Sequence, residues 1–330
     1  MALAGEFDII ARIFAPLATD ASALGLKDDA AVLTVTDDHQ LVVTCDTLVS
    51  GVHFLKDDPP RSVGYKALAV NMSDLTAKGA HGYVYTLSLA LPRETDMAWL
   101  EAFAAGLAEV QDLTGISLVG GDTTATPGPV TITVTALGLV QHEAAITRLG
   151  AKPGDRLYTN GTIGDSYLGL KLLQDPACAE AWGLAESDVA YLTDRYRRPP
   201  IDTDAALVIR NFAKAAIDIS DGLVSDAEKL CGVSHVGADI EVARIPFSQA
   251  AQKVLQAAPD LLPEMVGAGD DYAALIAVSE GSAALFESEA ESHGVPFVQL
   301  GTITGADEGV RLLEPDGRVL ALERKGFSHF

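Results

Sequence analysis

Hydrophobic side chains in this chain change repeatedly between helical and strand-like spacing, and this alternation limits its fold more than any other feature. Strand-like runs cover residues 41–45, 84–91, 116–119 and 130–140, and helical spacing covers 5–17, 63–78 and 96–113. Gly or Asp residues separate these runs. Because an apolar period of about 3.6 residues predicts a helix and a period of two predicts a strand, the sequence indicates a mixed α/β protein.

Both periodicities break at residues 148–155, where Gly and Pro occur together. Such residues interrupt regular structure. At roughly 150 residues per domain, a chain of 330 residues also suggests about two domains. We therefore predict an N-terminal domain over 1–147 and a C-terminal domain over 148–330. Within the second domain we expect a strand at 156–159, a helix near 166–173, and a strand at 215–220 that runs into a helix at 221–230.

The charge balance excludes several classes of partner. The chain has 46 acidic residues against 23 Lys and Arg, which gives a formal charge of -23. Such a surface repels nucleic acids and anionic membranes, because both are bound largely through Lys and Arg. The three widely spaced cysteines predict no disulfide framework. With no basic leader and no apolar run approaching about 18 residues, we expect a soluble cytoplasmic protein.

Acidic residues interrupt the apolar elements near their ends. A period of two places Thr44 and Asp46 on one face of the strand at 41–47. On the helix at 63–78, Asp74 shares a stripe with Asn71 and Lys78. A carboxylate among apolar neighbours needs water, a partner or a metal, and an ion pair with Lys78 is the alternative to a metal.

The segment at 216–223 has the most specific pattern. Asp218 and Ser220 share a strand face, and Asp221 stands where a helix begins. A helix N-terminus attracts phosphate, but an acid there repels it unless a cation lies between them. A metal bridge is therefore one interpretation, and a plain N-cap is the other.

Further acids occur in short segments that are less specific. The segment at 120–124, Gly-Gly-Asp-Thr-Thr, is interpreted as a turn after a strand, although paired glycines also let a ligand approach the backbone. Acid pairs at 28–29 and 270–271 open strands, whereas those at 37–38 and 57–58 are expected in solvated turns.

Many carboxylates and hydroxyls, without a Cys or His cluster, suit hard cations such as Mg²⁺, which bind oxygen ligands and phosphates. This combination suggests nucleotide chemistry. The sequence has no GxxxxGK[ST] loop and no protein-kinase motif set. The Gly-rich turn at 161–166 is a candidate phosphate contact or a structural turn.

In this order, the motifs resemble the thiamine-monophosphate kinase family, in the superfamily of aminoimidazole ribonucleotide synthetase and selenophosphate synthetase. The resemblance covers nearly the whole chain and is carried by residues 5–7, 28–32, 46–54, 71–75, 120–124, 150–155, 218–223 and 326–330. It implies a two-domain α/β (α+β) fold like that of aminoimidazole ribonucleotide synthetase, with an N-terminal mixed sheet with helices and a C-terminal α/β domain that closes over the active site. In the family the N-terminal sheet pairs with that of another subunit, so a homodimer is expected.

The resemblance also implies an activity, namely ATP-dependent phosphorylation of thiamine monophosphate to thiamine diphosphate by direct, Mg²⁺-assisted in-line transfer. Several Mg²⁺ ions would be held by Asp29, Thr44, Cys45 through its backbone, Asp46, Asp74, Asp122, Asp218 and Asp221. Among these, the catalytic residues would be Asp46, Asp74 and Asp221. ATP would contact Gly121, Asp122, Arg148 and Ser220. The substrate would be held by His53, Asp270 and Phe327.

Two other functions stay open at this point. A related ATP-using enzyme is one, but selenophosphate synthetase would need a reactive Cys before Cys45, and the hydrogenase-maturation relatives end in a Cys-containing tail that this chain lacks. The other is a non-catalytic protein that binds divalent cations or Mg-ATP. Acids in both predicted domains disfavour it, because a cation buffer clusters its ligands in one loop. Two residues also have structural alternatives: His53 as a packed imidazole, and Arg195 as a favourable charge at a helix C-terminus.

Overall fold

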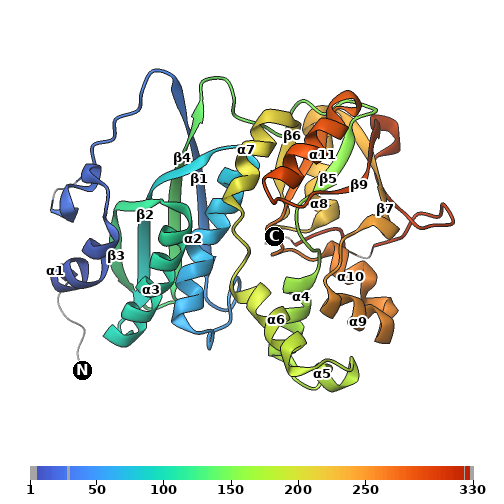
Figure 1. The fold of residues 1–330 in the computed structure, drawn as a ribbon. Coiled ribbons are helices and arrows are strands. Elements are labelled where there is room, and N and C mark those ends of the chain that lie inside the picture. Colours follow the sequence, from blue (N-terminus) through green and yellow to red (C-terminus); the bar gives the residue numbers. More distant parts are fainter. Residues whose placement is uncertain (1–5, 28–29, 323, 328–330) are drawn as a thin grey trace. The chain divides into compact units, whose positions relative to one another are not determined.

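The computed structural model describes residues 6–27, 30–322 and 324–327, which form two compact units (Figure 1). The first unit contains the chain up to Leu75 together with Ala80–Ala145. The second contains Thr76–Gly79 and the chain from Ile146 onward. Each unit has its own β-sheet with helices, so the mixed α/β class predicted from the sequence is confirmed.

The sheet of the first unit has the strand order β1-β4-β2-β3. Its strands are β1 (His39–Val49), β2 (His81–Pro92), β3 (Ser117–Thr126) and β4 (Thr131–Gln141). Strand β4 runs antiparallel to both β1 and β2, whereas β3 runs parallel to β2.

Strand β3 continues through the Gly-Gly-Asp-Thr-Thr segment, so the prediction of a turn at 120–124 was wrong. These residues pair with β2 in register, with Leu87 opposite Gly121 and Ser88 opposite Asp122. A Cβ atom at Gly121 would lie only 1.9 Å from the carbonyl oxygen of Leu87. The glycine therefore permits close strand pairing here.

The helices of the first unit are α2 (Pro60–Ala77) and α3 (Met97–Thr114), which pack closely on each other. A Cβ atom at Gly64 would lie 2.0 Å from the carbonyl oxygen of Phe103, so only glycine allows this approach. The helix expected at 5–17 is irregular. It consists of α1 (Glu6–Ile9), a π-helical turn (Ile10–Phe14) and a 3₁₀ turn (Ala15–Leu17), and a further 3₁₀ segment spans Ala21–Leu26.

The sheet of the second unit has the order β10-β7-β9-β5-β8-β6 and is antiparallel except between β10 and β7. Its strands are β5 (Arg156–Thr159), β6 (Ala213–Asp218), β7 (Val236–Glu241), β8 (Ala274–Val278), β9 (Val298–Gly305) and β10 (Val310–Leu313). Its α-helices are α4 (Asp165–Gln174), α5 (Cys178–Ala181), α6 (Glu186–Arg197), α7 (Thr203–Phe212), α8 (Leu223–Ser234), α9 (Gln249–Ala257), α10 (Leu262–Gly267) and α11 (Ala283–Ser292). Short 3₁₀ turns span Val242–Arg244, Pro259–Leu261, Glu280–Ser282 and Ala306–Glu308.

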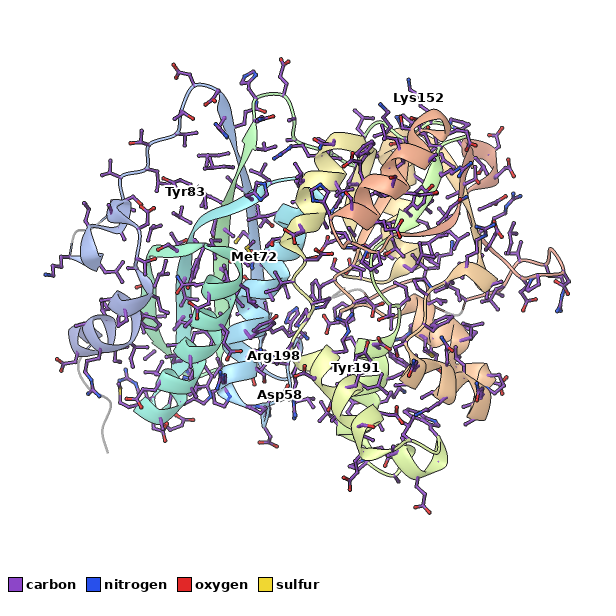
Figure 2. All side chains as sticks on the ribbon, in the orientation of Figure 1. Asp58, Met72, Tyr83, Lys152, Tyr191 and Arg198 are labelled. Atoms are coloured by element: carbon purple, nitrogen blue, oxygen red, sulfur yellow. The ribbon has the colours of Figure 1, made fainter. Side chains whose placement is uncertain are left out.

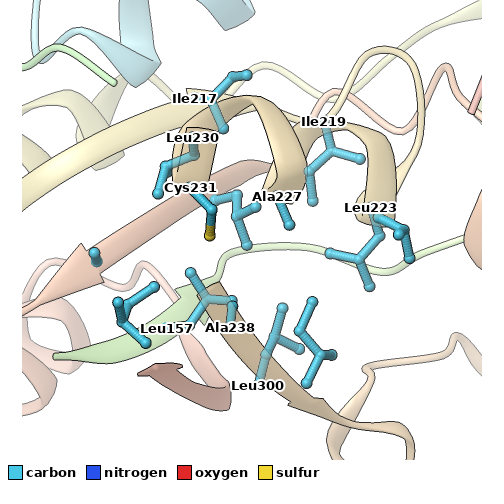
Figure 3. Packing of buried hydrophobic residues seen from close by; sticks show 14 of the residues in the cluster. Leu157, Ile217, Ile219, Leu223, Ala227, Leu230, Cys231, Ala238 and Leu300 are labelled. Atoms are coloured by element: carbon cyan, nitrogen blue, oxygen red, sulfur yellow. The ribbon is translucent and has the colours of Figure 1, made fainter. Parts of the chain in front are cut away.

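Helix α8 lies on this sheet and fixes the segment that precedes it. Figure 3 shows Leu223, Ala227 and Leu230 of α8 packed with Leu157 and Ile217 of the sheet. All five side chains are buried. Because the core fixes both β6 and α8, the residues between them, 219–222, are held at a defined position. None of the helices in the described part of the chain is long and apolar enough to cross a membrane.

Candidate active site

In the first unit, the structure brings Thr44 and Asp74 together. The hydroxyl of Thr44 on β1 donates a hydrogen bond to Oδ2 of Asp74 on α2. Asp46 lies on the same face of β1 as Thr44, as the period of two predicted. Lys78, the alternative partner of Asp74, donates from Nζ to the carbonyl oxygen of Ala216 at 2.7 Å. One hydroxyl and two carboxylates thus share the helix-covered face of the sheet.

Cys45 lies between Thr44 and Asp46, and its side chain is on the opposite, exposed face. There its thiol accepts a hydrogen bond from Thr135 at 3.4 Å. If Thr44 and Asp46 hold a cation, only the backbone of Cys45 could join them. A backbone oxygen suits a hard cation better than a thiol sulfur does.

Asp122 also lies on the exposed face. Strand pairing places Asp122 in the same row across the sheet as Thr47, through Thr133 and Ser88. Asp46 lies in the next row, which ends at Gly121. Residues opposite one another in a sheet point to the same side, so the carboxylates of Asp122 and Asp46 point to opposite sides. Strands β4 and β2 lie between Asp46 on β1 and Asp122 on β3. Three strand spacings therefore separate the backbones of the two residues, which is about 14 Å. Within one chain, these two predicted ligands are not brought together.

His53 is held in a defined orientation by the turn after β1. The backbone N–H of Val49 donates to Nδ1 of His53 at 3.0 Å. Nδ1 is therefore an acceptor, and the hydrogen of the neutral ring is assigned to Nε2. Lys66, of which only 1% is exposed, donates from Nζ to the carbonyl oxygen of His53 at 3.0 Å. The imidazole thus presents an N–H donor, which is suited to an anionic oxygen.

The turn that follows His53 depends on Asp58, which was expected to be solvated. Asp58 is buried in the turn that precedes α2 (Figure 2), and the prediction was wrong. Its carboxylate accepts a hydrogen bond from the backbone N–H of Leu55 at 2.7 Å. A carboxylate that caps a turn in this way replaces part of its lost hydration.

In the second unit, Asp218 is buried at the end of β6, and Ser220 and Asp221 follow before α8 begins. The amides of Asp221 and Gly222 both donate to Oδ2 of Asp226, at 2.9 and 3.1 Å. Burial raises the pKa of Asp226, although its ion pair with Lys229 offsets part of this effect. Asp226, rather than Ser220 or Asp221, therefore caps this turn.

The two predicted substrate residues of the second unit lie against the Ser220–Asp221 segment. The N–H of Asp270 donates to the carbonyl oxygen of Ser220 at 2.9 Å, and the N–H of Phe327 donates to that of Asp221 at 2.9 Å. The Phe327 side chain is 49% exposed, so its ring can contact a ligand. The structure thus brings Ser220, Asp221, Asp270 and Phe327 into one neighbourhood.

Arg148 is exposed, and Ser234 fixes its loop. The Ser234 hydroxyl donates to the carbonyl oxygen of Arg148 at 2.9 Å and accepts from the N–H of Gly150 at 3.1 Å. Ser234 ends α8, whose other end follows Asp221, so about 18 Å of helix separates the Arg148 backbone from that residue. Asp29, another predicted ligand, lies outside the described residues.

Among residues 6–27, 30–322 and 324–327, no three His, Cys, Asp or Glu side chains converge closely enough to hold a metal by themselves. The donors that are present nevertheless fit Mg²⁺. Thr44, Asp46 and Asp74 offer only oxygen atoms, as do Asp218 and Asp221. Mg²⁺ usually keeps several waters and binds through one or two carboxylates together with substrate phosphates, so a closed protein cage is not required.

Comparison with known proteins identifies the family. Residues 27–140 match the model for the N-terminal domain of AIR synthase related protein, and residues 152–313 match that for its C-terminal domain. The chain is 39% identical to thiamine-monophosphate kinase of Escherichia coli K12, over 99% of this chain and 98% of that protein. It is 40% identical to that of Caulobacter vibrioides, over 98% of this chain and 90% of the relative. The chain belongs to the thiamine-monophosphate kinase family.

Solved structures of the thiamine-monophosphate kinase family have the same fold. The enzyme from Stenotrophomonas maltophilia K279a matches with a TM-score of 0.84 at 37% identity, covering 97% of this chain and 99% of that one. AaThiL complexed with AMPPCP and TMP matches with a TM-score of 0.77 at 28% identity, covering 98% and 94%. Escherichia coli HypE, a hydrogenase maturation protein, is only 19% identical and shares the fold alone.

Proposed function

We propose that this chain transfers the γ-phosphoryl group of ATP to the phosphate of thiamine monophosphate, which gives thiamine diphosphate and ADP. The observation that carries this proposal is the identity of 39% with a thiamine-monophosphate kinase over essentially the full length of both proteins. A structural relative has been solved with AMPPCP and TMP together. AMPPCP replaces the oxygen between the β- and γ-phosphates by a methylene group, so it is an ATP analogue that resists transfer.

The acidic residues would hold Mg²⁺ ions, whose chemistry is to neutralise phosphate charge and to align the reacting oxygens. In the first unit we propose Thr44, the backbone of Cys45, Asp46, Asp74 and Asp122 as ligands, together with Asp29. In the second unit we propose Asp218 and Asp221. The hydrogen bond between Thr44 on β1 and Asp74 on α2 supports the grouping of Thr44, Asp46 and Asp74, because it fixes the orientation of the Asp74 carboxylate. Asp122 points to the opposite side of the sheet, so it would hold a different ion from these three residues. Transfer would then be direct, without a phosphoenzyme.

ATP would contact the backbone at Gly121, the side chains of Asp122 and Arg148, and Ser220. The backbone of Gly121 lies in a strand, and the exposed guanidinium of Arg148 can pair with phosphate oxygens.

We propose that thiamine monophosphate is recognised by three groups of different chemistry. The Nε2–H group of His53 would donate to an oxygen of the substrate phosphate. The carboxylate of Asp270 would attract the positively charged thiazolium ring, and the exposed ring of Phe327 would stack on the substrate. Asp270 and Phe327 both bond through their backbone to the Ser220–Asp221 segment, which supports a shared role.

We further propose that the first unit forms a homodimer through the open face of its sheet. Val43 is 60% exposed on this face, and Leu41 and Cys45 are exposed beside it. Exposed apolar side chains on a flat sheet favour pairing with another protein surface. Because Asp122 shares this face, a second copy would lie close to it.

Phosphorus NMR of the purified protein with ATP, Mg²⁺ and thiamine monophosphate tests the proposed reaction. We expect thiamine diphosphate and ADP in the complete mixture and neither in reactions that lack the substrate or the metal. ADP without thiamine diphosphate would indicate a different acceptor. Binding of Mg-ATP with no turnover would instead favour a non-catalytic protein.

A further inference from the structure

A strained segment precedes β8 in the second unit, at Gly269–Tyr272. Asp270 has a φ of 71° and Tyr272 a φ of 52°, so two non-glycine residues adopt left-handed backbone conformations. Such conformations are unfavourable for residues with a Cβ atom, and a bulky Tyr rarely adopts one. They persist only where the surrounding structure holds them, often at ligand sites.

Backbone contacts hold this segment against the Ser220–Asp221 segment. The N–H of Asp270 donates to the carbonyl oxygen of Ser220 at 2.9 Å, and the N–H of Tyr272 donates to that of Ile219 at 2.8 Å. The approach is so close that a Cβ atom at Gly269 would lie 2.2 Å from the Ser220 oxygen. The Tyr272 hydroxyl also donates to Oδ1 of Asp270 at 3.0 Å and thereby orients the carboxylate.

Between the two strained residues stands Asp271, which is only 1% exposed. Both of its carboxylate oxygens lie 3.0 Å from the N–H of Gly164, which donates to them. Burying a carboxyl group is costly unless it is hydrogen-bonded, and the N–H of Gly164 supplies this bond. Its bond ties the strained segment to the turn that begins α4.

The turn that begins α4 is itself rigid. Asp165, the residue after Gly164, is fully buried and accepts hydrogen bonds from Thr162, Tyr191 and Ser248. Figure 2 labels Tyr191 on α6, whose hydroxyl lies 2.9 Å from Oδ2 of Asp165. Asp271 is therefore anchored to a fixed point, not to a mobile loop.

We infer that Asp271 is a positioning residue that holds Asp270 in its strained conformation, so that the Asp270 carboxylate meets the substrate next to the Ser220–Asp221 segment. Asp271 is buried and does not itself touch the substrate. This inference rests on the proposed phosphorylation of thiamine monophosphate, in which Asp270 contacts that substrate. Loss of the Asp271–Gly164 bond would let residues 270–272 relax and would move the Asp270 carboxylate.

Steady-state kinetics of Asp271→Ala and Asp271→Asn test this inference. We expect Asp271→Ala to raise the KM for thiamine monophosphate about tenfold or more, with a smaller change in the KM for ATP. Asn keeps one acceptor oxygen for Gly164, so Asp271→Asn should recover part of the loss. Asp155→Ala is the matched control, because Asp155 is also a buried acid that accepts a backbone N–H, from Lys152 at 2.8 Å.

A double-mutant cycle separates positioning from a general effect on folding. If Asp271 acts through Asp270, then adding Asp271→Ala to Asp270→Ala should raise the KM for thiamine monophosphate little further. Should Asp271→Ala fail to fold, the same cycle is made with Asp271→Asn, which preserves volume. Additive effects in the cycle, or wild-type KM values in folded Asp271 variants, would overturn the inference. Absence of thiamine monophosphate phosphorylation in the wild-type protein would refute the proposed function itself.

Discussion

The ammonium group of Lys229 forms an ion pair with the carboxylate of Asp221, a proposed magnesium ligand. The same Nζ atom lies 2.7 Å from Oδ1 of the buried Asp226. Burial lowers the pKa of Lys229, but its hydrogen bonds to the two carboxylates outweigh this and raise the pKa overall. Lys229 is therefore a cation at neutral pH, and a Mg²⁺ ion at Asp221 would have to compete with it.

Replacement of Lys229 by Met should make Mg²⁺ binding tighter. The ion pair with Asp221 is partly solvated, so its loss should change the affinity modestly, by about three- to tenfold. Titration of the nucleotide-free protein with Mg²⁺ in a calorimeter measures this directly. Lys325→Met is the control, because it also removes one positive charge from an ion pair. The partner of Lys325 is Glu228, which lies on α8 next to Lys229. An equal gain in Mg²⁺ affinity in both variants would mean that net charge alone causes the gain. That outcome would contradict competition at Asp221.

Asp46→Asn and Asp221→Asn should each lower kcat by about 100-fold or more while the protein stays folded. An amide keeps the size of the carboxylate but removes the negative charge that binds a metal, so charge stabilisation in the transition state is lost. Turnover assays combined with circular dichroism measure both parts of this prediction. The exposed Asp57→Asn provides a control for loss of one acid. Turnover of Asp46→Asn at the wild-type rate would remove that residue from the catalytic set.

The elements with clear periodicity could be predicted from the sequence, and those defined by distant contacts could not. The strand at 156–159 is found at the predicted residues, where a short run between Gly- and Pro-containing turns marks it locally. In contrast, β3 passes through Gly120 and Gly121, where the sequence indicated a turn. Its extension depends on pairing with β2, which lies about thirty residues earlier and leaves no local signal.

The residues that hold the candidate site residues in place could not be predicted from the sequence. Lys66 stands in an apolar helix with nothing nearby in sequence to show that it bonds to His53. Asp271 looked like one member of an acid pair, although its partner Gly164 is over a hundred residues away. Motif order could point to Asp270 and Asp221, but a supporting hydrogen bond depends on tertiary packing that spacing does not encode.

Stability at rising pH should distinguish wild type from Asp271→Asn. Burial, the largest effect, raises the pKa of Asp271 well above its ordinary value of 3.8. The folded protein therefore holds this proton more tightly than the unfolded chain, and its stability falls as the pH rises from the unfolded value through the folded one. Asn has no proton to lose, so denaturant titrations should show the wild-type free energy of unfolding falling relative to the variant. A difference that stays constant with pH would mean that Asp271 keeps its ordinary pKa.

Charge on the open face of the first sheet should separate the subunits of the proposed homodimer. Val43 is 60% exposed in the isolated chain, and a glutamate there would have to be buried without a partner when a second copy covers it. We therefore expect Val43→Glu to sediment as a monomer at concentrations where the wild type is a dimer. Leu285→Glu is the matched control, since Leu285 is equally exposed on α11 of the second unit. A dimer that survives Val43→Glu but dissociates with Leu285→Glu would place the interface on the second unit instead.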